Sequence, residues 1–331
     1  MSEVIVHIGL PKCASTTLQN RYFDNHDQIF YLGSRIKSKP KNDLFIQLFR
    51  EVAVYPSKRT PDVNTNDCFY TSLIYKKDLK EAISRKYDSH FVGLFYEKFI
   101  KNSLSPNQKI VVSAEGLSVS SIVPTLEIAE RLNHAFKRAK IIVILRNPID
   151  WLKSRYLQMY RGIPGKIKKL PNFSDWLQIH YQERAKIQSM YQDLCWGRLL
   201  GKYSTLFGSE NIKVLLFEQF VKDKQQFLSE LSNFSGIDML DVKKDVISDH
   251  LNPTITNGDV ILKKLFAPKF NFLINRYSVW IFNQIAGYKP TLKIEHDILE
   301  RTLEYIKPEL DEIANTWHPP FQRYGYPVST K

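Results

Sequence analysis

Four short apolar runs, each separated from the next by a stretch long enough for a helix, limit this chain to few folds. The runs are rich in β-branched residues and lie at 4–8, 110–113, 140–145 and 212–217. Continuous apolar strands that alternate with helices are typical of a parallel sheet covered on both faces. We therefore predict an α/β fold with three layers and a central parallel sheet.

The length of 331 residues suits one large domain, 1–331, because a single core can grow to about this size. A Lys-rich and Tyr-rich segment, 34–107, separates the first two predicted strands, and we expect an insertion of helices and loops there. Positions 260–294 hold six Lys or Arg and no Asp or Glu. The segment 250–331 is therefore predicted to be a basic C-terminal lid on the acceptor side.

The charge balance favours anionic partners, since 47 Lys and Arg face 34 Asp and Glu, a net charge of +13. The three cysteines are widely spaced, which indicates neither a disulfide framework nor a zinc site and favours a reducing compartment. The first residues lead into an apolar run without a basic signal region, and no run of about 18 apolar residues occurs. We expect a cytoplasmic protein, with peripheral contact to a membrane left open.

The segment 4–18 has the pattern of a phosphate-binding loop. An apolar strand leads to a turn with Gly9, Pro11 and Lys12, and small hydroxyl residues then open a helix. Backbone N–H groups at a helix N-terminus, aided by the helix dipole, bind phosphate in this way. The alternative is a plain connection between a strand and a helix.

This loop departs from the Walker pattern G-x-x-x-x-G-K-[ST]. Gly9 stands at the first Gly, but Ala14 replaces the second Gly and Ser15 replaces the Lys, while the cation lies earlier, at Lys12. A nucleoside triphosphatase needs its Lys on the β- and γ-phosphates together with Mg²⁺. A Lys in the turn is instead placed to neutralise the oxygen that bridges a 5'-phosphate and a transferred group. A P-loop kinase that uses Mg·ATP stays the enzymatic alternative.

A second motif follows the strand 140–145. Asn147 and Pro148 predict a helix start directly after Arg146, so Arg146 lies at the carboxyl end of a strand, where ligands of open α/β sheets bind. Ser154 is eight residues further on, about two helical turns along. An Arg fork and a hydroxyl at these positions would suit a second phosphate, such as a 3'-phosphate. A strand-end salt bridge and a solvated helix position are the alternatives.

These two motifs resemble those of the sulfotransferase superfamily that uses 3'-phosphoadenosine 5'-phosphosulfate (PAPS). The 5'-phosphosulfate loop of that family is similar to Pro11-Lys-Cys-Ala-Ser-Thr16, and its 3'-phosphate motif is similar to the segment from Arg146 to Ser154. The segments 7–12 and 31–33 are most similar to bacterial members that act on carbohydrates, and 212–218 resembles a later core strand that ends in an acidic residue. The resemblance implies a P-loop NTPase-like sulfotransferase fold.

The resemblance also implies the roles of individual residues. Lys12, Ser15, Thr16 and Thr17 would hold the 5'-phosphosulfate, and Arg146 with Ser154 would hold the 3'-phosphate. Ala14 lies in the same loop, where the family usually has Gly, and would narrow the space beside the phosphate. The family's reaction is an in-line displacement that leaves adenosine 3',5'-bisphosphate and uses no metal, so catalysis consists of positioning and charge stabilisation.

Three residues are candidates for the base that takes the proton of the acceptor hydroxyl. Glu115 follows the strand 110–113, and in the resembling family a His or Glu from this strand end acts as the base. A partly desolvated Glu can have its pKa raised toward the working pH. His7 lies within the first strand, where a satisfied core histidine is the simpler interpretation, and His250 at the start of the predicted lid is a third candidate.

The acceptor side is predicted from basic and aromatic residues. Arg161, Lys166, Lys168 and Lys169 follow the second motif, and aromatic residues lie among the lysines of the C-terminal segment. A glycan or glycolipid acceptor at an anionic membrane surface fits this pattern, and so does an ordinary lid helix with a solvated face. No nucleic-acid module accompanies the charge. A noncatalytic glycan- or membrane-binding protein on the same fold is the remaining alternative.

Overall fold

The computed structural model describes residues 3–33, 104–118, 125–162, 171–186, 189–239 and 292–329. Two compact units make up the chain. The first contains Met1–Arg146, Cys195–Leu251 and Glu309–Lys331, and the second contains Asn147–Leu194 and Asn252–Pro308. The assignment of 1–331 to a single sulfotransferase domain stays a prediction.

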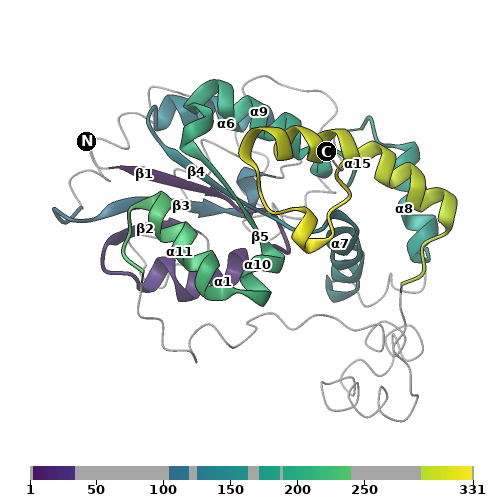
Figure 1. Cartoon of the computed structure of the whole chain (residues 1–331), viewed down its shortest axis with the longest axis horizontal. Coiled ribbons are helices and arrows are strands. Elements are labelled where there is room, and N and C mark those ends of the chain that lie inside the picture. Colours follow the sequence, from purple (N-terminus) through teal and green to yellow (C-terminus); the bar gives the residue numbers. More distant parts are fainter. Residues whose placement is uncertain are drawn as a thin grey trace, which may run out of the picture. The chain divides into compact units, whose positions relative to one another are not determined.

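A five-stranded parallel sheet forms the centre of the first unit (Figure 1). Its order is β2-β3-β1-β4-β5, and every neighbouring pair is parallel. The predicted α/β class with a central parallel sheet is thereby confirmed. The strands are β1 (Val4–Ile8), β2 (Ile29–Gly33), β3 (Lys109–Ala114), β4 (Lys140–Leu145) and β5 (Ile212–Leu216).

Two details of the strands differ from the prediction. The edge strand β2 was not among the four predicted runs, because Ile29 is its only β-branched residue and it follows the 3-10 turn η1 (Phe23–Asn25) closely. The last predicted strand ends one residue early, since Phe217 already begins the helix α10 (Phe217–Lys222). The residues of β1 and β2 are buried throughout, as expected for strands covered on both faces.

Helices cover both faces of this sheet (Figure 1). On one face lie α1 (Ser15–Arg21), α10 and α11 (Lys224–Ser235), and on the other lie α6 (Thr125–Ala135) and α9 (Trp196–Phe207). The sheet and its two helical layers form the predicted three-layer arrangement. Because the strands are all parallel, their carboxyl ends lie on the same side of the sheet, and the loops that carry both motifs begin there.

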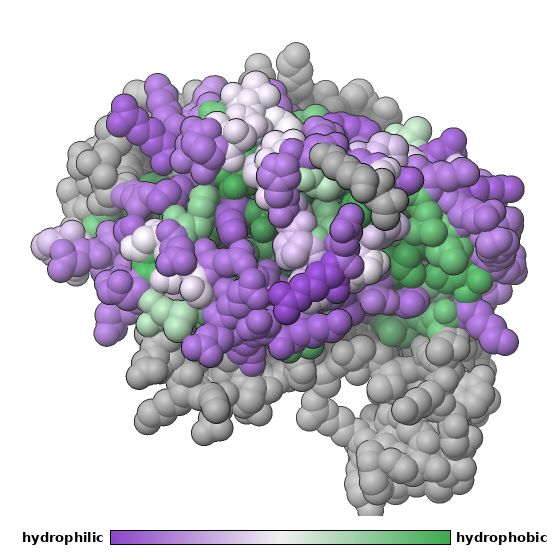
Figure 2. Space-filling model, in the orientation of Figure 1, coloured by the Kyte–Doolittle hydropathy of each residue, from purple (hydrophilic) through white to green (hydrophobic). Residues whose placement is uncertain are grey.

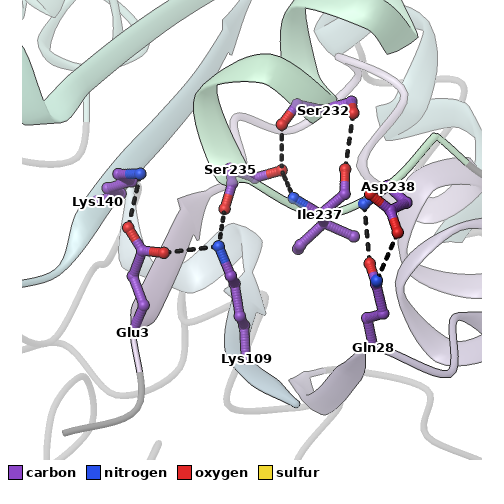
Figure 3. A network of polar contacts seen from close by, with 8 residues as sticks. All are labelled: Glu3, Gln28, Lys109, Lys140, Ser232, Ser235, Ile237 and Asp238. Carbon is purple, nitrogen blue, oxygen red and sulfur yellow. Dashed lines mark hydrogen bonds and ion pairs between the residues drawn. The ribbon is translucent and has the colours of Figure 1, made fainter. Parts of the chain in front are cut away.

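At the amino ends of the strands, a network of charged residues holds the sheet together (Figure 3). The Glu3 carboxylate lies 2.7 Å from Nζ of Lys109 and 2.6 Å from Nζ of Lys140, which begin β3 and β4. Lys109 also donates to the carbonyl oxygen of Ser235 at the end of α11, at 2.8 Å. Partial burial acts to raise the pKa of Glu3, but the two lysines outweigh it and hold that pKa below its usual value. Glu3 thus links the starts of β1, β3 and β4, and Lys109 extends the network to α11.

The second unit contains α7 (Pro148–Gly162), α8 (Phe173–Gln182) and the 3-10 turn η8 (Gln192–Leu194). An aromatic cluster packs α7 against α8, with the ring of Tyr156 5.0 Å from that of Phe173 and 5.5 Å from that of Trp176. The helix α15 (His296–Trp317) contributes its residues up to Pro308 to this unit and the rest to the first.

Several predictions concern residues outside the described ranges. Only 104–107 of the predicted insertion 34–107 is described, and of the predicted lid 250–331 the structure describes 292–329, which form α15 and the 3-10 turn η11 (Gln322–Tyr324). The basic residues at 166–169 and His250 also lie outside the described residues.

The described part of the face seen in Figure 2 is polar over one group of helices and more hydrophobic at its right side. Figure 2 shows mostly hydrophilic side chains on the visible face over α10 and α11. Within the described ranges, Ile179, Val221 and Met239 are the exposed large hydrophobic residues. None of the described helices combines the length and the apolar character that a membrane crossing requires.

Candidate anion-binding site

The loop between β1 and α1 is closed by contacts of its own residues. The N–H of Gly9 donates to the carbonyl of His7 at 3.0 Å, and Oγ of Ser15 donates to the carbonyl of Leu10 at 3.0 Å. A Cβ atom at Gly9 would lie 2.9 Å from Oγ of Ser15, so the turn has no room for a larger residue there. The Ser15 hydroxyl, predicted to contact phosphate, therefore also fixes the shape of the loop.

Two residues of this loop adopt the left-handed backbone conformation although they are not glycines. Lys12 has a φ of 68° and Ala14 a φ of 61°. Such a conformation is sterically unfavourable for residues with a Cβ, and it concentrates at functional sites. Ala14 is also the N-cap of α1 and provides no side-chain cap. The position where Ala14 replaces the family's Gly is thus one where Gly would be unstrained.

Hydroxyl groups lie at the start of α1. Thr16 and Thr17 are half-buried in its first turn, and neither hydroxyl has a hydrogen-bond partner within the described part of the chain. The N–H groups of a helix start and unpaired hydroxyls are both donors for an anion. No acidic residue lies in this first turn.

Glu115 lies beside the loop because its strand is the neighbour of β1. Ile8 pairs with Ala114 in the parallel register, so Gly9 and Glu115 both follow the carboxyl ends of adjacent strands. Glu115 begins the 3-10 turn η6 (Glu115–Leu117). Oγ of Ser118 lies 2.9 Å from the carbonyl oxygen of Gly9 and 3.0 Å from that of Glu115, and it ties the two segments together.

Arg146 reaches the same edge from β4. Its Nη1 donates to the carbonyl of Lys12 at 3.2 Å, and its guanidinium lies 4.6 Å from the ring centre of Phe217, which follows β5. Its Nε is buried without a hydrogen-bond partner, and no described carboxylate forms an ion pair with it. A buried guanidinium N–H without a partner is costly unless a ligand satisfies it.

Four charged side chains act on one buried thiol in this site. Burial raises the pKa of Cys13, the carboxylates of Glu218 and Glu115 add to this rise, and the cations of Arg146 and Lys12 oppose it. The sequence predicted Lys12, Glu115 and Arg146 as site residues, and the structure brings these three together. The raised pKa keeps the Cys13 thiol protonated and therefore unreactive.

The predicted helix start after Arg146 is confirmed. The helix α7 begins at Pro148, and the N–H of Ile149 donates to Oδ1 of Asn147 at 3.2 Å. Ser154 is buried on this helix. It belongs to the second unit, whereas Arg146 belongs to the first, and the predicted pairing of Ser154 with Arg146 stays a prediction.

His7 lies inside the sheet, below the loop. Its Nδ1 is 2.7 Å from Oγ of Ser113, and Nε2 of Gln19 donates to the same Oγ at 3.1 Å. Burial lowers the pKa of His7 to about 4, so the ring is neutral near pH 7. The ring is fully buried, and its Nε2 has no hydrogen-bond partner. This environment matches a core histidine better than a base that meets an acceptor.

Two residues of the site were not predicted. Oη of Tyr326 donates to Oε2 of Glu218 at 2.8 Å, and the Phe217 ring packs on Arg146. The pairing of β4 with β5 aligns Leu145 with Leu216, so Arg146 and Phe217, which follow them, lie side by side. A prediction that included this pairing could have placed Phe217 next to Arg146. Tyr326 lies 108 residues from Glu218 in the sequence, and no local pattern indicates its position.

The described ranges contain no group of three His, Cys, Asp or Glu side chains that could hold a metal ion. The donors around the loop suit a phosphate-like anion instead. The buried Nε of Arg146 and the hydroxyls of Thr16 and Thr17 can all donate hydrogen bonds to anionic oxygens.

The chain matches the sulfotransferase family over residues 5–241. This match covers more than half of the 331 residues, and the chain belongs to the sulfotransferase family. It is therefore assigned to the enzymes that transfer a sulfuryl group, and the predicted superfamily is confirmed. No curated protein gives a significant match.

Comparison with solved structures also finds sulfotransferases. A sulfotransferase from Alicyclobacillus acidocaldarius aligns with a TM-score of 0.56 and 17% identity over 98% of each chain. The sulfotransferase domain of the Synechococcus PCC 7002 olefin synthase aligns with a TM-score of 0.41 and 12% identity over 92% of this chain and 94% of that domain. The sulfotransferase domain from the curacin biosynthetic pathway aligns with a TM-score of 0.41 and 14% identity over 92% of this chain and 96% of that domain. The first of these similarities supports the predicted sulfotransferase fold.

Proposed function

We propose that this enzyme transfers the sulfuryl group of PAPS to a hydroxyl group of a glycan or glycolipid. The observation that carries the proposal is Arg146, whose buried Nε lacks a partner beside a phosphate loop that already contains Lys12. Two separate cationic groups suit a nucleotide with phosphates at both its 5' and 3' positions. A kinase would need its lysine at position 15, where this chain has Ser15.

The loop residues would bind the 5'-phosphosulfate. Lys12 neutralises charge on the bridging oxygen, and the segment 14–17 provides backbone and hydroxyl donors at the start of α1. Arg146 and Ser154 bind the 3'-phosphate. PAPS supplies the activated sulfuryl group, and adenosine 3',5'-bisphosphate is the product that remains on these residues. No metal takes part in this proposal.

Glu115 is proposed as the base that accepts the proton of the acceptor hydroxyl. Its position beside Gly9, together with the Ser118 link between the two segments, supports this role. A base must lie within hydrogen-bond reach of the proton that it removes, and a carboxylate next to the loop proposed to bind the phosphosulfate would be suitably placed. Of the other two candidates, His7 is fully buried and His250 lies outside the described residues.

The acceptor class rests on charge and on the family resemblance. The net charge of +13 and the basic segment 260–294 favour an acidic glycan, or a lipid-linked acceptor at an anionic surface of the cytoplasmic membrane. We propose a cytoplasmic enzyme that contacts such a surface peripherally.

The donor class can be tested by calorimetric titration with adenosine 3',5'-bisphosphate and with ATP, each with and without Mg²⁺. We expect tighter binding of the bisphosphate that does not depend on the metal. A preference for Mg·ATP would contradict the proposal and favour a kinase. Binding of the bisphosphate without turnover of any hydroxyl acceptor would favour a noncatalytic protein on the same fold.

Arg146→Ala tests the 3'-phosphate assignment. The variant should lose affinity for adenosine 3',5'-bisphosphate by about 10- to 100-fold, because it removes charge-assisted hydrogen bonds. Its affinity for adenosine 5'-phosphate should change little, since that ligand lacks the 3'-phosphate. Equal losses for both ligands in calorimetry would show that Arg146 does not bind the 3'-phosphate.

Glu115→Gln tests the base. The amide keeps the shape of the side chain but cannot accept the proton, so turnover should fall by about 10²- to 10⁴-fold while bisphosphate affinity stays within about twofold. The measurement is a PAPS-dependent turnover assay with a panel of glycan acceptors, together with bisphosphate titration. Near-normal turnover would assign the base to another residue.

A further inference from the structure

The turn at the C-terminal end of the described chain reaches the candidate site. Tyr326 is buried, its ring is stacked on that of Phe321 at 4.5 Å, and its Oη donates to Oε2 of Glu218 at 2.8 Å. Glu218 lies in the first turn of α10, directly after Phe217. A hydrogen bond between two distant segments therefore fixes a carboxylate beside the residues predicted to bind the donor.

This carboxylate lies close to Arg146 without pairing with it. Glu218 and Arg146 both shift the pKa of the Cys13 thiol and that of Tyr326, in opposite directions. They also flank Phe217, since Glu218 follows it in sequence and Arg146 packs on its ring. Within the described residues, however, Arg146 forms no ion pair, and its Nε has no partner.

An arginine and a carboxylate that act on the same two groups can also form an ion pair with each other, and such a pair would occupy the guanidinium with its own neighbour. Tyr326 provides the alternative partner for the carboxylate. Burial raises the pKa of Tyr326 well above its usual value, and Glu218 raises it further, so the phenol keeps its proton and remains a donor.

We propose that Tyr326 is a positioning residue that holds Glu218 away from Arg146 and so keeps the guanidinium available for the 3'-phosphate of the donor. The inference rests on the proposed function, in which Arg146 binds that phosphate. Tyr326 contacts neither the ligand nor the reacting atoms; it acts through Glu218. Without the Tyr326 hydroxyl, Glu218 turns to Arg146 and competes with the 3'-phosphate for the guanidinium.

The test compares two phenylalanine substitutions in the same turn. Tyr326→Phe removes only the hydroxyl that binds Glu218, whereas Tyr324→Phe removes a buried hydroxyl that has no hydrogen-bond partner. For each variant, affinities for adenosine 3',5'-bisphosphate and adenosine 5'-phosphate are measured by calorimetry. We expect Tyr326→Phe to weaken bisphosphate binding by about tenfold relative to adenosine 5'-phosphate, the effect of one competing charge-assisted contact. Tyr324→Phe should leave this ratio within about twofold of wild type.

A second substitution separates competition by Glu218 from a general disturbance of the turn. Adding Glu218→Gln to Tyr326→Phe should restore most of the lost preference for adenosine 3',5'-bisphosphate over adenosine 5'-phosphate, because a neutral amide does not compete for the guanidinium. A ratio unchanged by Tyr326→Phe, an equal effect of Tyr324→Phe, or no recovery in the double variant would each overturn the inference. If the wild-type protein itself does not prefer the bisphosphate, the proposed 3'-phosphate site fails, and this inference falls with it.

Discussion

Ala14 combines an unfavourable backbone conformation with a position at the centre of the candidate site. A left-handed conformation costs a residue with a Cβ roughly 1–2 kcal/mol, and φ at Ala14 is 61°. Lys12, two residues earlier, has the same type of conformation. The surrounding contacts of Gly9 and Ser15 hold the loop in this shape.

Ala14→Gly should relieve this strain. The gain is reduced by the greater freedom of Gly in the unfolded chain, and we expect a net stabilisation of about 0.5–1 kcal/mol. The control is Ala314→Gly in the interior of α15, where Gly should cost about 0.5–1 kcal/mol. Chemical denaturation of both variants measures the difference. A loss at position 14 as large as that at position 314 would show that the left-handed conformation carries little strain.

At the scale of elements, the contact between α9 and α15 depends on two glycines one helical turn apart. A Cβ at Gly197 would lie 2.7 Å from the carbonyl oxygen of Glu309, whereas a Cβ at Gly201 would lie 3.2 Å from a carboxylate oxygen of Glu312. The N–H of Arg198 donates to Oε2 of Glu309 at 2.8 Å in the same contact. The backbones of the two helices approach this closely at position 197 only because Gly197 has no Cβ.

Gly197→Ala should therefore destabilise the protein, and Gly201→Ala should not. Overpacking against a backbone atom costs about 1–3 kcal/mol, which exceeds the gain of up to about 1 kcal/mol in helix propensity. At Gly201 the neighbour is the end of a flexible side chain that can move, so the propensity gain should dominate. Thermal or urea unfolding of both variants tests this contrast, and equal effects would contradict the close contact at Gly197.

The whole sheet shows what the sequence could and could not predict. The bounds of β1 and β4 agree with the predicted runs, because continuous runs of β-branched residues flanked by helix signals are distinctive. The edge strand β2 has a single β-branched residue and carries no such signal. The placement of Lys12, Glu115 and Arg146 at the same side of the sheet was predictable because the carboxyl ends of parallel strands lie together, whereas their roles stay a prediction. The placement of Tyr326 was not predictable, because its contact with Glu218 depends on how a distant segment packs.

Glu3 makes the stability of the sheet depend on pH. Its pKa is lower in the folded protein than its usual value of 4.5, so its contribution is present above pH 4.5 and disappears as the pH falls through the lowered value. Glu3→Gln should cost about 1 kcal/mol at pH 7 and low salt, since the carboxylate is partly exposed and its ion pairs are screened. At pH 3 the difference from wild type should be smaller.

Denaturant unfolding at both pH values measures this dependence. Glu183→Gln is the matched control, because Glu183 is exposed and pairs with a single neighbour, Lys186, on the same segment. Its effect should be small at both pH values. A Glu3→Gln effect that stays constant between pH 7 and pH 3 would show that the charge of Glu3 does not stabilise the sheet.

The contact between Tyr326 and Glu218 also sets an order of events during synthesis. Glu218 leaves the ribosome 108 residues before its partner, which at about 5–20 residues per second is a delay of roughly 5–20 s. Throughout this interval the sheet, which ends with β5 at Leu216, can form while Glu218 and Arg146 are free to attract each other. The buried residues of α15 and of the last turn are still missing at that stage. On the proposed role of Tyr326, the nascent chain therefore passes through a stage at which Glu218 occupies Arg146, and translation of the last turn separates the two.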